Sequence, residues 1–137
     1  MQATMRGIAL TTTVVLSVIP EAQAATKTAN YSPAIERAYA ARAVVGLVQG
    51  KCKDHLTVNL ARAHALQKEA GLGDQSVPDQ ESASRATRAI IDKMAEAGVK
   101  HGMQAGEMHV PQNRCLALLY TFGPEGTWIK GLVAEKP

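Results

Sequence analysis

The sequence has few cysteines and aromatic residues, and it lacks the motifs of common reaction centres. Its 137 residues include only two cysteines, and aromatic residues make up 4% of the chain. It has no C-x-x-C motif, so nothing indicates a thioredoxin-type redox pair or c-type haem attachment. The G-x-S-x-G motif of many hydrolases is also missing. No motif therefore predicts a specific reaction, and the informative features are the N-terminus, the two thiols and the helical periodicity.

Clusters of charge of one sign are also missing. The chain has 15 lysines and arginines against 12 aspartates and glutamates, a net charge of +3, and the cations are scattered among the anions. A nucleic-acid or membrane surface usually needs cations gathered in one run or on one face. The composition therefore predicts no nucleic-acid partner and no strongly basic membrane-binding patch.

The N-terminal 24 residues have the organisation of a secretory signal peptide. Arg6 precedes an apolar run of about twelve residues at 8–19, and Ala-Gln-Ala at 22–24 fits the small-x-small pattern of signal peptidase. A membrane-spanning helix needs about twenty apolar residues, so the run is short for an anchor. We expect cleavage after Ala24 and a periplasmic or secreted chain without a stable membrane span. An uncleaved anchor and a lipoprotein are the alternatives, and no cysteine at the cleavage site supports the lipoprotein.

Both cysteines, Cys52 and Cys115, follow the predicted cleavage site. Because the compartments beyond the inner membrane are oxidising, we expect them to form an intramolecular disulfide. Closing a loop of about 64 residues would stabilise the fold by roughly 4 kcal/mol in the chain-entropy model. Free thiols and an intermolecular bond are the alternatives. His55 could complete a zinc site with reduced thiols, but export disfavours that arrangement.

The rest of the chain predicts a small all-α fold, a bundle of about four helices. Residues 25–31 are small and polar and are expected to be a flexible tail, and residues 32–137 are expected to be a single disulfide-stapled helical domain. Ser32 and Pro33 have the pattern of an N-cap followed by proline in the first turn, and Gly50 that of a C-cap. These signals predict the first helix.

Apolar spacing predicts the next two helices. One is expected from Cys52 or Asp54 to Ala70, where apolar residues recur every three or four positions before a glycine-rich loop. Another begins at Pro78 or Asp79, and oppositely charged pairs at i,i+4 mark its solvated face.

A short fourth helix is predicted after Asn113, which can cap it, and Gly123-Pro124 is its stop signal. The alternative is a hairpin over residues 116–133. The C-terminal segment is expected to be irregular or hairpin-like and to lay Trp128, Ile129 and Leu132 back onto the helices. The predicted core consists of large apolar residues at helical spacing and of C-terminal aromatic residues: Ile35, Val45, Leu56, Leu60, Ile90, Met94, Leu118, Leu119, Phe122 and Trp128.

The segment GVKHGMQAGEMHV at 98–110 has two interpretations. If the third helix continues through it, three glycines lie one per turn and let another helix come close: Gly98, Gly102 and Gly106. If it is a loop, four side chains could converge on a metal such as copper, which soft ligands suit: His101, Met103, Met108 and His109. On a helix, His101 and Met108 would lie about 10 Å apart along the axis, too far for one ion. We favour helix packing.

These observations favour a non-catalytic function. The leading hypothesis is a small exported helical protein of the cell envelope that binds a protein, a peptide or a small ligand and needs no cofactor. Periplasmic metal handling through the His101–His109 segment is the alternative. A hydrolase without a recognisable motif is a second alternative.

Overall fold

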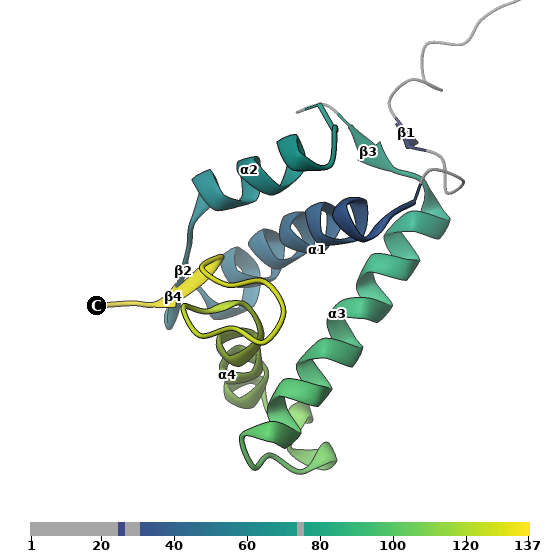
Figure 1. Ribbon diagram of the computed structural model, residues 1–137. Coiled ribbons are helices and arrows are strands. Elements are labelled where there is room, and N and C mark those ends of the chain that lie inside the picture. Colours follow the sequence, from purple (N-terminus) through teal and green to yellow (C-terminus); the bar gives the residue numbers. More distant parts are fainter. Residues whose placement is uncertain (1–24, 27–30, 74–75) are drawn as a thin grey trace, which may run out of the picture.

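The computed structural model describes residues 25–26, 31–73 and 76–137 and shows a mostly helical chain (Figure 1). The predicted all-α fold class is confirmed by four α-helices: α1 (Pro33–Leu47), α2 (Leu60–Glu69), α3 (Gln80–Lys100) and α4 (Pro111–Phe122). Shorter elements connect and flank them: a π-helical turn (Val48–Cys52), a 3-10 helix (Ala105–His109), β1 (Ala25–Thr26), β2 (Leu56–Val58), β3 (Val77–Pro78) and β4 (Val133–Glu135). The predicted signal peptide at 1–24 lies outside the described residues, as do residues 27–30 of the predicted tail. Residues 25–26 of that tail pair in parallel with β3.

Helix α1 begins where the sequence predicts it. The Ser32 hydroxyl oxygen accepts a hydrogen bond of 3.2 Å from the backbone N–H of Ile35. Pro33 occupies the first turn, where a missing N–H breaks no helical hydrogen bond. The predicted stop at Gly50 lies inside the π-helical turn, which continues the chain to Cys52.

The second helix is shorter than the periodicity predicts. Its expected first turn is instead strand β2, which pairs antiparallel with β4 at the far end of the sequence. Asn59 then caps α2, which starts at Leu60. Leu56 is buried in the sheet, but Leu60 is 54% exposed. The core assignment of Leu60 is therefore wrong, because the strand removes the helical relation that would have placed it beside Leu56.

Helices α3 and α4 follow the predicted pattern more closely. The Asp79 carboxylate accepts a 2.7 Å hydrogen bond from the N–H of Ser82 and so caps α3. The segment 116–122 is helical, not a hairpin. Helix α4 starts at Pro111, so the predicted cap at Asn113 is wrong. The Asn113 amide instead donates a 2.9 Å hydrogen bond to the carbonyl of Glu107.

The main core lies between the four α-helices and the C-terminal segment. Six predicted core residues are buried: Ile35, Leu56, Ile90, Met94, Leu118 and Phe122. Three more are partly buried and pack against the main cluster: Val45, Leu119 and Trp128. Ile129 and Leu132 are fully buried, which confirms that the C-terminal segment folds back onto the helices.

A smaller cluster joins the start of α1 to α3. Ile35, Tyr39 and Ala86 are its buried members, and Tyr31 packs against them. The Tyr31 hydroxyl donates a 3.0 Å hydrogen bond to Glu36, and the Arg85 guanidinium carbon lies 4.1 Å from the centre of the Tyr31 ring. Burial, together with the bond to Glu36 and the negative charge of its carboxylate, raises the pKa of Tyr31 well above its ordinary value. The phenol therefore stays protonated and keeps donating.

Two adjacent isoleucines in α3 test this packing. Ile90 is 3% exposed and Ile91 is 61% exposed. Ile90→Ala should lower the free energy of unfolding by about 2–5 kcal/mol, because it leaves a cavity. Ile91→Ala should change it by about 0.5 kcal/mol or less, as for most surface substitutions. Urea unfolding followed by far-UV circular dichroism measures both, and equal losses would contradict the orientation of α3.

Candidate functional site

Helix α3 ends at Lys100, so the segment 98–110 is not one continuous helix. The N–H of Met103 bonds to the carbonyl of Gly98 at 2.8 Å, and that of Gly102 bonds to Val99 at 3.0 Å. This is the Schellman arrangement that closes a helix, and it requires the positive φ of +90° that Gly102 adopts.

The predicted glycine row therefore does not form. Gly102 lies in the closing turn and Gly106 in the separate 3-10 helix, so neither faces another helix. Of the three glycines, only Gly98 lies in α3, where it is buried. A Cβ atom added there would lie 3.3 Å from the sulfur of Met103 and 3.7 Å from that of Met108. Gly98 thus makes room for two methionine side chains and not for a helix backbone.

The structure does not bring the four residues of the metal hypothesis together: Met103 and Met108 both pack at Gly98, whereas His101 and His109 line different cavities. The His101 ring stacks on Tyr120 with ring centres 3.8 Å apart and planes at 6°, and its Nδ1 lies 3.0 Å from the carbonyl of Ala97. His101 lines a cavity beside α4, whereas Met108 and His109 line a different one. Within the described ranges, no group of three or more His, Cys, Asp or Glu side chains is arranged to hold a metal.

A largely apolar groove of about 740 Å³ lies between α1, α3 and the start of α4, and we call it the α1–α3 groove. Figure 1 shows α1 and α3 diverging from one end, with α4 and the 3-10 helix near the other. Small-molecule sites typically have volumes of about 300–1,000 Å³. Most of its lining residues are apolar: Ala43, Gly46, Leu47, Gly50, Ile90, Ile91, Met94 and Met108.

The two long walls of this groove differ in shape. On the α1 side, Gly46 and Gly50 have no described atom within 4 Å of the place where a Cβ would stand, so this wall is shallow and open. Leu47 is 40% exposed on the same wall, and Ile91 faces the groove from α3 with most of its side chain accessible. The groove therefore presents aliphatic surface to any molecule that enters it.

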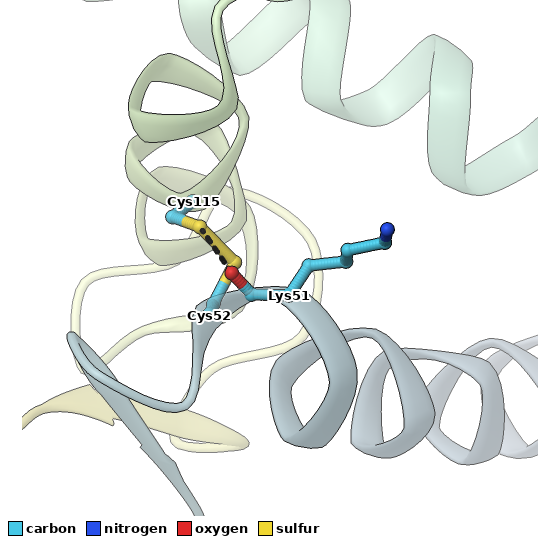
Figure 2. The surroundings of a disulfide bond; sticks show 3 residues. All are labelled: Lys51, Cys52 and Cys115. Atoms are coloured by element: carbon cyan, nitrogen blue, oxygen red, sulfur yellow. Dashed lines mark hydrogen bonds between the residues drawn. A yellow bond between two sulfur atoms is a disulfide. The ribbon is translucent and has the colours of Figure 1, made fainter.

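One end of the groove reaches the disulfide. A connected cavity of about 170 Å³ shares Leu47 and Met94 with the groove and is lined by Cys52 and Cys115. The two cysteines form the predicted intramolecular bond, with an S–S distance of 2.04 Å and a Cα–Cα distance of 5.7 Å (Figure 2). This bond fastens the π-helical turn that follows α1 to the second turn of α4.

Two cations stand at this end. Lys51 directly precedes Cys52, and Arg114 directly precedes Cys115; both are exposed and line the groove and the connected cavity. The Lys51 carbonyl oxygen lies 3.7 Å from the Cys115 sulfur, and the Lys51 side chain extends away from the disulfide (Figure 2). Neither cation forms an ion pair with another described residue, and no described acidic residue lines the groove.

A more polar depression of about 510 Å³ lies beside β2 and β4. It brings Asp54 and His55 near Glu135, but none of its lining residues is a serine, a threonine or a free cysteine. Its lining therefore offers carboxylates and an imidazole but no hydroxyl or thiol nucleophile.

Sequence reasoning missed the α1–α3 groove. The predictions used apolar periodicity, which identifies buried faces, whereas the groove is formed by residues left uncovered. Two signals were available: glycines at 46 and 50 on one face of the first helix, and the doubled isoleucine at 90–91, of which only one can face the core. Neither signal reveals which surface stays open until the helices are placed.

Comparison with protein-family models, with curated proteins and with solved structures found no match for the chain. No helix in the described part is both long and apolar enough to cross a membrane. Function is therefore inferred from the groove itself.

The disulfide gives a stability prediction. Replacing both Cys52 and Cys115 with alanine should lower the free energy of unfolding by about 4 kcal/mol, because a cross-link over 63 residues restricts the unfolded chain. Denaturant unfolding measures the loss. A reductant should destabilise the original protein by a similar amount and leave the double variant unchanged. Equal unfolding midpoints before and after reduction would contradict a stabilising bond.

Proposed function

We propose that the chain is an exported, non-catalytic binding protein of the cell envelope and that the α1–α3 groove is its binding site. One observation carries the proposal: exposed Leu47 and Ile91 line the same concave surface as two uncovered glycines. Covering apolar surface is worth about 25 cal/mol per Å². A ligand that covers this groove therefore gains affinity without any change in the fold.

The chemistry of the lining supports binding over catalysis. Three of its residues are basic, namely Lys51, Arg114 and His109, and Thr87 is the one hydroxyl group among the described lining residues. No carboxylate there can act as a general base or orient His109. Such a lining can hold and orient a molecule, but it offers no paired acid and base.

Two observations support the export part of the proposal. The first is the signal-peptide pattern of residues 1–24. The second is the disulfide, since such bonds persist mainly in oxidising compartments.

No specific observation supports either alternative function, metal handling or hydrolysis. His101 and His109 line different cavities, so we do not propose metal handling by the His101–His109 segment. For a hydrolase, the polar depression offers no hydroxyl or free thiol among its lining residues.

The groove can be tested with an uncharged dye that fluoresces in apolar surroundings. Gly46→Leu should weaken dye binding at least tenfold, because the new side chain fills the groove. It should not disturb folding, because no described atom lies within 4 Å of the added Cβ. Ala61→Leu is the matched control, since Ala61 is an exposed α2 residue outside the groove lining. Equal dye binding by both variants would exclude the groove as the site.

Export can be tested by mass. When the full chain is produced in a bacterium and the cells are fractionated, the periplasmic form should have the intact mass of residues 25–137. Ala24→Lys should leave uncleaved precursor, because signal peptidase requires a small residue there. A periplasmic product with the mass of all 137 residues would contradict cleavage.

A further inference from the structure

The disulfide determines where the two groove cations stand. Its two Cα atoms are 5.7 Å apart, and each cation is one residue before a cysteine. With about 3.8 Å between neighbouring Cα atoms, those of Lys51 and Arg114 lie no more than about 13 Å apart. Both side chains are long, so both can reach a single anionic group at this end of the groove. Residues 63 positions apart in the sequence are thereby held as a pair.

We propose that the α1–α3 groove binds a long-chain carboxylate, with its hydrocarbon tail between α1 and α3 and its carboxylate on Lys51 and Arg114. This inference rests on the proposed function and adds the class of ligand. The apolar walls match a tail, and the two cations, unpaired among the described residues, match an anionic head. An arginine fork can bind both oxygens of a carboxylate, and a lysine supplies a second, point-like charge.

The size of the groove favours a ligand with a single hydrocarbon chain over a helical peptide. A helix with side chains is about 10 Å wide, so about 740 Å³ holds only about six of its residues. The groove is also bounded on three sides, by α1, by α3 and by the 3-10 helix with α4. Such a site suits a ligand that ends within it.

The experiment is displacement of the uncharged dye from the full, oxidised chain by three twelve-carbon probes: dodecanoate, dodecanol and dodecyltrimethylammonium. The two ionic probes are used below their micelle concentrations and dodecanol below its solubility limit. Dodecanoate should displace the dye at a concentration about tenfold lower than dodecanol, which corresponds to one charge-assisted hydrogen bond. The cationic probe should be the weakest of the three. The preference for dodecanoate should shrink as salt is added, because both protein cations are exposed.

Charge variants separate the head group from the tail. Lys51→Gln with Arg114→Gln should weaken dodecanoate binding about tenfold more than it weakens binding of dodecanol or the dye, and the remaining dye binding also shows that the variant is folded. Lys68→Gln with Arg88→Gln removes the same charge from exposed positions outside the groove and should change nothing.

The outcomes that oppose the inference are distinct. Equal displacement by dodecanoate and dodecanol, or a preference that survives in the Lys51 and Arg114 variant, would contradict carboxylate binding by the two cations. It would leave the groove as the proposed apolar binding site. Absence of dye binding and of displacement would contradict both the proposed function and the carboxylate site. An acidic amphipathic helical peptide that binds more tightly than dodecanoate would assign a different occupant and overturn the inference. A dimer seen in sedimentation that dissociates in the Gly46→Leu variant would assign a second copy of the chain to the groove and would also overturn the inference.

Discussion

The Cys52–Cys115 bond is the constraint on which the arrangement of this chain depends. It joins the turn that follows α1 to the second turn of α4, across a sequence separation of 63 residues. Between these points lie all of α2 and α3. Aromatic residues make up only 4% of the chain, so large rings can supply little of the core, and a covalent link offsets part of the entropy of ordering the helices. The same link lines the smaller cavity that shares Leu47 and Met94 with the α1–α3 groove.

The C-terminal segment supplies much of the remaining cohesion. After α4 the chain turns back tightly: a Cβ at Gly126 would lie 2.5 Å from the carbonyl oxygen of Thr121, so only glycine fits there. This turn lets the N–H of Leu132 bond to the carbonyl of Phe122 at 2.9 Å. The rings of Phe122 and Trp128 then approach with centres 5.8 Å apart. Strand β4 continues from this turn and pairs with β2. The region after α1 is therefore tied to α4 by the disulfide and to the C-terminal segment by the sheet.

Features of the fold that depend on neighbouring residues could be predicted from the sequence. Features that depend on residues far apart in the sequence could not. Ser32 caps α1 as the sequence indicates, because capping is decided within a few residues. Asp79, one of the two positions at which the third helix was expected to begin, is the N-cap of α3. The exposure of Leu60 depends on a strand whose partner is Val133–Glu135, and no local periodicity can reveal that pairing. The spacing of Gly98, Gly102 and Gly106 suggested a row on one helix, whereas Gly102 lies in the turn that ends α3. The disulfide was predictable because only two cysteines were available, whereas the cation pair beside it follows from the bond itself.

The glycines of the groove connect stability to function. Each exposed glycine in a helix costs about 1 kcal/mol relative to alanine, and no described atom approaches Gly46 closely enough to offset that cost. A buried glycine such as Gly98 is explained by the methionines packed on it, but Gly46 has no such explanation within the described chain. A ligand lying against α1 would supply the missing contact, because a Cβ there would occupy its path. Under the proposed function, the open wall costs stability but leaves room for the ligand, and the cations beside the disulfide would select its head group.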